Sequence, residues 1–160
     1  MAFTTILILE KYAGGGSVTL PVEAFSFDVE QTLNIGSQGT GAGAGKIVFN
    51  PFSVTRFPDQ LSPGLFALCA SGTPFQRAIL TVTPDGAGVP YITYLMKLAA
   101  IKTISAGGNQ HGGPLPLETV TFEYGALLFI YEDPGTKRMT INGWNRVKNI
   151  EDDDPSSIII

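Results

Sequence analysis

The feature that most constrains the fold is a run of alternating apolar residues in the last third of the chain. Within residues 117–132, apolar side chains occupy every second position, at Val120, Phe122, Tyr124, Ala126, Leu128 and Ile130. Successive side chains of a β-strand point to opposite faces, so this period of two predicts a long strand with one face in the core.

Similar patterns recur along most of the chain and predict a mainly β protein. We expect further strands at residues 3–10, 18–33, 46–57, 75–83, 90–104 and 137–144. Turn sequences rich in glycine, proline and aspartate separate them. Within residues 18–33, Phe25, Phe27 and Val29 are expected to face the core. Many strands joined by hairpin-like turns indicate an antiparallel β-barrel or sandwich.

One short helix is expected within this β framework. Ser62 is a good N-cap residue, and Pro63 suits the first helical position. Gly72 is placed to end the helix, which is then about three turns long at most. The single cysteine, Cys69, lies in this segment and is expected to be buried as a small hydrophobic residue.

Length and charge indicate one domain and exclude some partners. The chain has 160 residues, of which only 15% are charged, and a net charge of −4. We expect a single β domain over residues 1–150 and a flexible acidic tail, or one held by a neighbour, over residues 151–160. So few basic residues argue against nucleic acid as a partner. The low charge suggests that other copies of the chain cover part of the surface.

The sequence contains no segment typical of membrane insertion or Sec export. Its unbroken apolar runs are short, as at 6–9 and 126–130. A membrane-spanning helix needs about 20. The N-terminal residues lack the basic segment and apolar core of a signal peptide. We therefore expect no membrane insertion and no Sec signal.

A glycine-rich segment at residues 34–45 resembles a nucleotide-binding loop only superficially. It holds five glycines in twelve residues and leads into Lys46. A phosphate-binding loop needs glycine at its first anchor and serine or threonine after the lysine, but Thr40 and Ile47 stand at those positions. The segment also precedes a strand rather than a helix. We therefore predict a mobile loop and no nucleotide site.

Candidate catalytic residues are few and show no organised pattern. His111, the only histidine, lies in a glycine-rich loop without metal ligands nearby in the sequence. A Ser-His-Asp triad is formally possible, but no nucleophile motif accompanies it. Carboxylate pairs could be drawn from four acids: Asp28, Glu30, Glu118 and Glu123. Any chain of this length offers such pairs, so we expect no catalytic site, no cofactor and no metal.

A set of short motifs in a fixed order provides the most specific signal. The motifs are Ala24-Phe25-Ser26-Phe27, Ala44-Gly45-Lys46, Phe52-Ser53-Val54-Thr55, Asp59 with Ser62-Pro63, Cys69-Ala70-Ser71-Gly72, Ala78-Ile79-Leu80-Thr81, Tyr94-Leu95-Met96-Lys97-Leu98, Ile104-Ser105-Ala106-Gly107-Gly108, residues 116–125 and Gly143-Trp144-Asn145. In order and spacing the chain resembles the Hcp family, the tube proteins of bacterial type VI secretion systems. The resemblance covers roughly residues 3–150 and excludes the acidic tail.

The resemblance implies a structural rather than an enzymatic role. Hcp proteins are small β-barrels with one helix that form hexameric rings, and the rings stack into a hollow tube. A contractile sheath propels the tube, tipped by a VgrG-type spike, and effector proteins can travel in its lumen. The expected partners are therefore further copies of the chain, spike, sheath and effectors. The expected route runs from the bacterial cytoplasm through the type VI machine to the outside.

Two surface features are candidates for roles in such a tube. The glycine-rich loop is expected to contact the next ring, through Gly36, Gly39, Gly41, Gly43, Gly45 and Lys46. The polar residues Ser26, Asp28 and Glu30 are expected to line the lumen, although an ordinary outer face fits them equally well.

Other functions remain open at this point. A tube protein of a phage tail or another contractile injection particle would have the same architecture. A monomeric ligand-binding β-barrel would need an exposed aromatic patch, and the sequence predicts none. A hydrolase is the least supported, because it would need His111 ordered beside a serine and a carboxylate.

Overall fold

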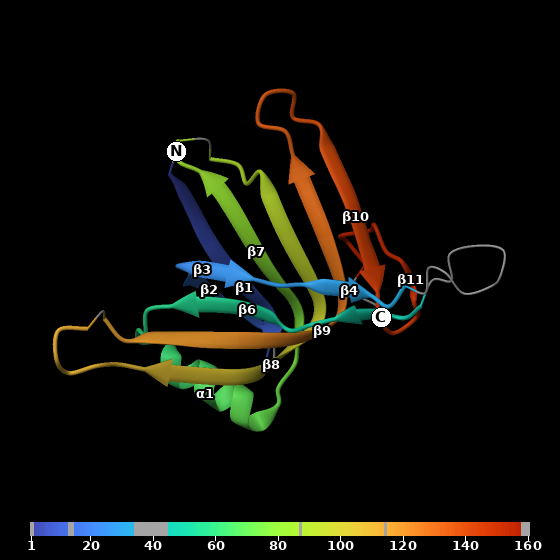
Figure 1. Cartoon of the computed structure of the whole chain (residues 1–160). Helices are drawn as coiled ribbons and strands as arrows, with labels where there is room; N and C mark the ends of the chain where they lie inside the picture. Colours follow the sequence, from blue (N-terminus) through green and yellow to red (C-terminus); the bar gives the residue numbers. More distant parts are fainter. Residues whose placement is uncertain (1, 13–14, 34–44, 87, 114, 158–160) are drawn as a thin grey trace.

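The computed structural model describes residues 2–12, 15–33, 45–86, 88–113 and 115–157, and it confirms a mainly β fold with one short helix (Figure 1). The elements in chain order are β1 (Phe3–Tyr12), β2 (Gly16–Pro21), β3 (Ala24–Ser26), β4 (Val29–Gln31), β5 (Ile47–Phe49), β6 (Phe52–Arg56), α1 (Ser62–Ser71), β7 (Phe75–Pro84), β8 (Ile92–Gly107), β9 (Leu117–Glu132), β10 (Met139–Asn145) and β11 (Ile150–Glu151).

A long hairpin of β8 and β9 organises two layers of strands. The strands pair along their whole length, from Ile92 opposite Tyr131 to Gly107 opposite Leu117. One half of the hairpin belongs to an upright sheet with the order β11-β10-β9-β8-β7-β1-β2, and β9 pairs in its other half with β6, which pairs with β3. Figure 1 shows this second group running across the foot of the upright strands. The core fills the angle between the layers.

The hairpin changes its core-facing side where it bends. In β9, Val120, Phe122 and Tyr124 belong to the main core cluster, but Leu127 takes the next core position. The strict alternation predicted through Ile130 is therefore wrong beyond Tyr124. In β8, Leu98 has a φ of 48°, a left-handed conformation that moves the core side to the odd-numbered residues. As a result, Ala126 and Leu128 are buried on the opposite, outer face of the upright sheet.

Residues 18–33 do not form the single strand that the sequence predicts. After Pro21 the chain turns a corner, since the Val22 N–H still donates to the Thr5 carbonyl oxygen of β1 while the Glu23 N–H donates to Thr55 of β6. The segment therefore leaves the upright sheet and joins the lower layer as β3. Phe25 and Phe27 face the core as expected, with the Phe27 ring stacked 5.3 Å from that of Phe52. The prediction is wrong for Val29, which is 46% exposed in β4 because this short strand pairs only with β5, outside the main sheet.

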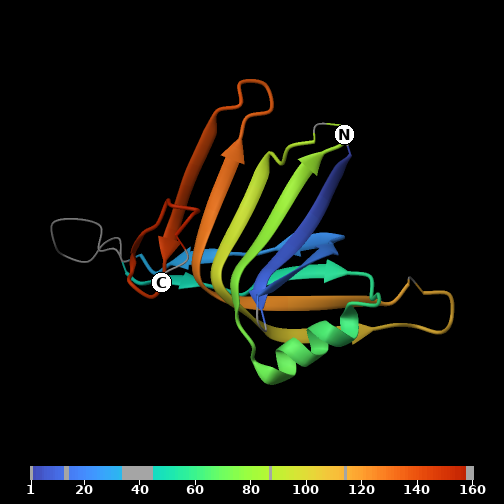
Figure 2. The same ribbon diagram turned by 180° about the vertical axis from the view of Figure 1, so that it is seen from behind.

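The helix α1 lies where the sequence predicts it, but its first turn is capped differently. Leu61 rather than Ser62 occupies the N-cap, and no side chain bonds there. The Ser62 hydroxyl accepts from the Asp59 N–H at 3.0 Å and donates to Glu118 at 2.9 Å. Gly72 ends the helix with a φ of 68°, as predicted. Figure 2 shows α1 beside β8.

Cys69 in α1 is half-buried rather than fully buried, and its thiol approaches the Lys102 carbonyl oxygen of β8.

No helix in the described part of the chain is long and apolar enough to cross a membrane.

A buried charged cluster joins α1 to the sheet. The Arg56 side chain is fully buried and pairs with Glu118 and, at 2.5 Å, with Asp59. Glu118 is the cross-strand neighbour of Arg56 in β9. The cluster thus fixes the start of α1 against the β6–β9 pair.

The C-terminal segment, residues 150–157, differs from the flexible tail that the sequence favours. It forms β11 and then crosses the outer face of the upright sheet (Figure 2). Asp152 pairs there with Lys97 of β8, and the Arg77 side chain donates to the Pro155 carbonyl oxygen. The physical reason is the buried lysine, which needs the acids of the tail as partners. Residues 158–160 lie outside the described part.

Candidate functional site

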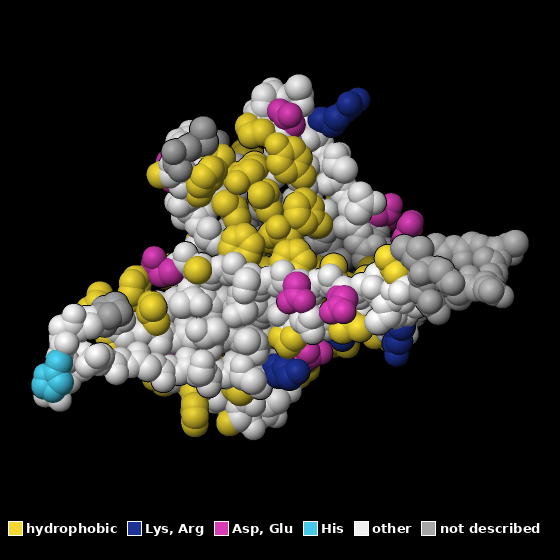
Figure 3. Space-filling view, in the orientation of Figure 1, with side chains coloured by type: hydrophobic (Ala, Val, Ile, Leu, Met, Phe, Trp, Pro, Cys, Tyr) yellow, Lys and Arg dark blue, Asp and Glu magenta, His cyan; other side chains and the backbone are white. Residues whose placement is uncertain are grey.

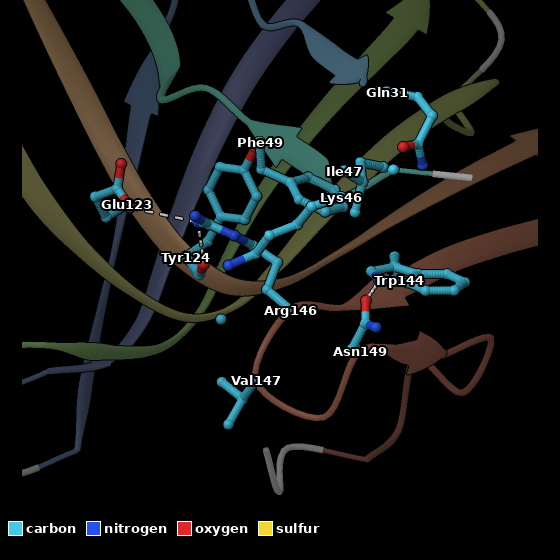
Figure 4. A pocket seen from close by; sticks show the side chains of 12 residues that line it. Gln31, Lys46, Ile47, Phe49, Glu123, Tyr124, Trp144, Arg146, Val147 and Asn149 are labelled. Carbon is cyan, nitrogen blue, oxygen red and sulfur yellow. Dashed lines mark hydrogen bonds and ion pairs between the residues drawn. The ribbon is translucent and has the colours of Figure 1, made fainter. Parts of the chain in front are cut away.

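A large pocket in the described surface lies beside Gly45 and Lys46, the described end of the glycine-rich loop. It measures about 1040 Å³ and opens between β5, the middle of β9 and the turn after β10 (Figure 4). The lining residues are Gln31, Gly45, Lys46, Ile47, Phe49, Glu123, Tyr124, Gly125, Trp144, Arg146, Val147 and Asn149.

Arg146 organises the floor of this pocket. Its guanidinium carbon lies 5.3 Å from the Phe49 ring centre and 5.1 Å from that of Tyr124, which places the cation over two aromatic faces. Nη1 donates to the Tyr124 carbonyl oxygen at 2.7 Å and to Glu123 at 3.3 Å. Figure 4 shows the guanidinium held between the two rings. Held in this way, Arg146 shapes the wall and has little freedom to move.

Tyr124 is part of the same framework. Its hydroxyl donates to the Asn50 carbonyl oxygen at 2.9 Å. Burial raises the pKa of this phenol to about 12, while nearby Arg146 opposes the shift by favouring the phenolate. The hydroxyl therefore stays protonated and serves to tie β9 to the start of β6.

The described end of the predicted stacking loop forms one wall of the pocket. The Lys46 N–H donates to the Thr32 hydroxyl at 2.9 Å, which closes the base of the loop. A side chain at Gly45 would overlap the Thr32 carbonyl oxygen, so only glycine fits this approach. Gly36, Gly39, Gly41 and Gly43 lie outside the described residues.

Trp144 also lines the pocket. Its indole N–H donates to the Asn149 side-chain oxygen at 3.3 Å across the turn that follows β10. The sequence singled out Trp144 only as part of a motif and missed Arg146 entirely. The spacing of aromatic and basic residues gave no sign that Phe49 and Arg146 would meet.

The three expected lumen residues are all exposed. Ser26 and Glu30 lie in β3 and β4, and Asp28 lies between these strands. The Asp28 carboxylate accepts a hydrogen bond from the Asn50 amide at 2.5 Å, so it also fixes the link between β5 and β6.

The candidate catalytic residues are not brought together. His111 is exposed at the tip of the loop after β8, where it appears in cyan at the end of a projection in Figure 3. Glu118 and Glu123 hold Arg56 and Arg146, respectively. No group of three possible metal-ligating His, Cys, Asp or Glu side chains occurs among the described residues.

An aromatic patch covers the concave side of the upright sheet, and the sequence predicted none. Figure 3 shows it as apolar side chains above the lower layer. Phe3, Phe129 and Tyr131 are each 39–46% exposed, and they continue through Tyr91. The sequence did not predict this patch because the core-facing side of β9 changes after Tyr124. Beyond that point the odd-numbered residues, Phe129 and Tyr131 among them, face the concave side. A connected apolar surface of this kind marks an interaction site in soluble proteins.

Several solved structures of other proteins share this fold. A type six secretion system protein superposes with a TM-score of 0.81 at 21% identity, over 94% of this chain and 100% of that chain. Hcp1 from Salmonella typhimurium gives 0.73 at 19% identity, over 94% and 99%. The baseplate structure of the anti-feeding prophage gives 0.51 at 11% identity, over 85% and 91%. No curated protein sequence matches significantly.

The chain therefore has the fold of solved type VI secretion system proteins such as Hcp1. The sequence itself matches the family described as "Type VI secretion system effector, Hcp" over residues 11–131. The chain belongs to the Hcp family, whose members are structural, non-enzymatic tube proteins.

Proposed function

We propose that this chain forms hexameric rings that stack into the tube of a type VI secretion system. Membership of the Hcp family carries the proposal. The exposed aromatic patch supports it, because about 40% exposure of several neighbouring aromatic side chains is costly for a free monomer. A closed ring needs head-to-tail contacts between different surfaces of identical subunits, and the patch supplies one such surface.

Ring stacking is the role that we assign to the glycine-rich loop. Its described base, Gly45 and Lys46, lines the pocket together with Trp144, so a neighbour that binds the loop would also reach the pocket. Ser26, Asp28 and Glu30 are exposed polar residues suited to a wetted lumen that holds effectors. Spike and sheath proteins are the further partners, and export proceeds from the cytoplasm through the machine.

Shortening the loop tests the stacking role. A chain lacking residues 36–43 is expected to form rings of wild-type mass that no longer stack in electron micrographs. A second variant, in which an equally long serine-rich segment replaces residues 36–43, keeps the length of the loop and changes only its sequence. Loss of the ring itself in the shortened chain would refute this assignment.

A tube of a phage-like injection particle is the second candidate, favoured by the similarity to the anti-feeding prophage structure. Neighbouring genes discriminate between the two: type VI sheath and membrane-complex genes support the first, and phage structural genes support the second.

A further inference from the structure

The lower layer carries a projection at one end and the pocket at the other. The turn that joins β8 to β9 is described at residues 108–113 and 115–116, which we call the hairpin tip. Figures 1 and 2 both show it extending beyond the other strands, on the side opposite to β4 and the end of β10. The pocket lies on that second side, between β5, the middle of β9 and the turn after β10.

A chain cannot place its hairpin tip in its own pocket. Along β9, seven positions separate Leu117, beside the tip, from Tyr124, which lines the pocket. At roughly 3.3 Å per residue these positions span about 23 Å. The tip also points away from the pocket (Figure 1). A tip that reaches this pocket therefore belongs to a second copy, displaced along the direction of these strands.

The hairpin tip is narrow and held in one conformation. The glycines Gly108, Gly112 and Gly113 carry no side chains, and the Asn109 side-chain oxygen accepts a hydrogen bond from the His111 N–H at 3.0 Å. Gly112 has a φ of 71°, and a Cβ at Gly113 would lie only 2.9 Å from that of Asn109. Because this shape exists before binding, docking of the tip costs little ordering entropy.

The tip and the pocket match in polarity. Leu115 of the tip is 70% exposed, and the pocket presents Trp144 together with Val147, which is 65% exposed. Contact between them removes two exposed aliphatic side chains from water. The described tip contains no Asp, Glu, Lys or Arg, and Arg146 of the pocket is already paired with Glu123. An uncharged tip therefore leaves that ion pair intact.

We propose that the pocket is the binding site for the hairpin tip of a copy in the next ring, with Leu115 placed against Trp144 and Val147. The contact is head-to-tail, between different surfaces of identical chains, and it repeats along one direction, as a stack of rings requires. Gly45 and Lys46 line the same pocket, so the hairpin tip and the glycine-rich loop meet at one ring-to-ring contact. This binding site rests on the proposed function, because it is filled only between stacked rings.

Disulfide crosslinking between two variants tests the contact. Leu115→Cys and Val147→Cys are prepared separately in a Cys69→Ser background, which removes the single native thiol. The two proteins are mixed in equal amounts, imaged by electron microscopy and oxidised mildly. We expect stacked rings and a crosslinked product that joins one chain of each variant. Phe66→Cys, at a site on α1 that is 68% exposed, replaces Leu115→Cys as the control and is expected to give no product with Val147→Cys.

The images separate the two ways in which this test can fail. Stacked rings without the 115–147 product, or an equal yield from the control, would overturn the proposed site and leave the stacking role standing. Particles that never stack would contradict the stacking role and the site with it.

A charge on the tip provides a second measurement. Leu115→Asp is expected to keep the ring mass seen by light scattering and to lose the stacks, because the carboxylate would be buried against Trp144 and Val147. Phe66→Asp, the matched change on α1, is expected to keep both. Stacks that survive Leu115→Asp would overturn the proposed site.

Discussion

Replacing Glu118 by glutamine tests the role of the buried charged cluster. Arg56 is fully buried and Glu118 is 5% exposed, so the variant leaves a guanidinium without its most buried counter-ion. Removing one partner of a buried pair costs about 3–5 kcal/mol. Asp59 remains at 2.5 Å from Arg56, and we therefore expect the lower end of that range. For a chain of this length about 3 kcal/mol corresponds to a fall in Tm of about 6–12 °C.

Urea unfolding followed by tryptophan fluorescence measures this change, with Trp144 as the single indole. Glu30→Gln makes the same chemical change at an exposed site and is expected to shift the free energy of unfolding by less than about 0.5 kcal/mol. The double variant Arg56→Met/Glu118→Leu is expected to recover most of the loss, because apolar replacement of a whole buried pair is often neutral. A loss below about 1 kcal/mol for Glu118→Gln would refute the reasoning, since the pair would then contribute no more than an exposed one.

Two further predictions concern the aromatic patch and Tyr124. Phe129→Ser is expected to weaken subunit association about thirtyfold, the effect of a 2 kcal/mol hot spot, whereas Phe66→Ser on the exposed side of α1 leaves the mass seen by light scattering unchanged. Equal effects of both variants would contradict a role of the patch. The raised pKa of Tyr124 means that the unfolded chain loses this proton first, so the free energy of unfolding should fall between about pH 10 and 12. Tyr124→Phe should reduce that fall, as urea titrations at both ends of the range would show; an unchanged fall would contradict the assignment.

Much of the fold could be predicted because its signals are local. The period of two in residues 117–132 and the Pro63 and Gly72 signals each depend on neighbouring residues. The change of core side in β8 and β9 could not be predicted in this way. It depends on the left-handed conformation of Leu98, a residue with no particular preference for it. The exposed aromatic patch was missed for that reason.

The site depends still more on long-range contacts. Arg146 packs on the ring of Phe49, which is nearly one hundred residues away in the sequence. No periodicity or spacing in the sequence predicts this contact. The acidic tail was expected to be flexible because its composition is polar. Its place on the sheet follows from Lys97, whose burial becomes visible only when β7, β8 and β9 are assembled. The ordered motifs, by contrast, indicated the Hcp family from the sequence alone.

The mass and shape of the wild-type particle test the central claim most directly. Light scattering across a sizing column gives the mass, and negative-stain images of the same peak give the shape. We predict a hexamer that appears as a ring with an open centre. A monomer at every concentration, with no rings in the images, would contradict the account.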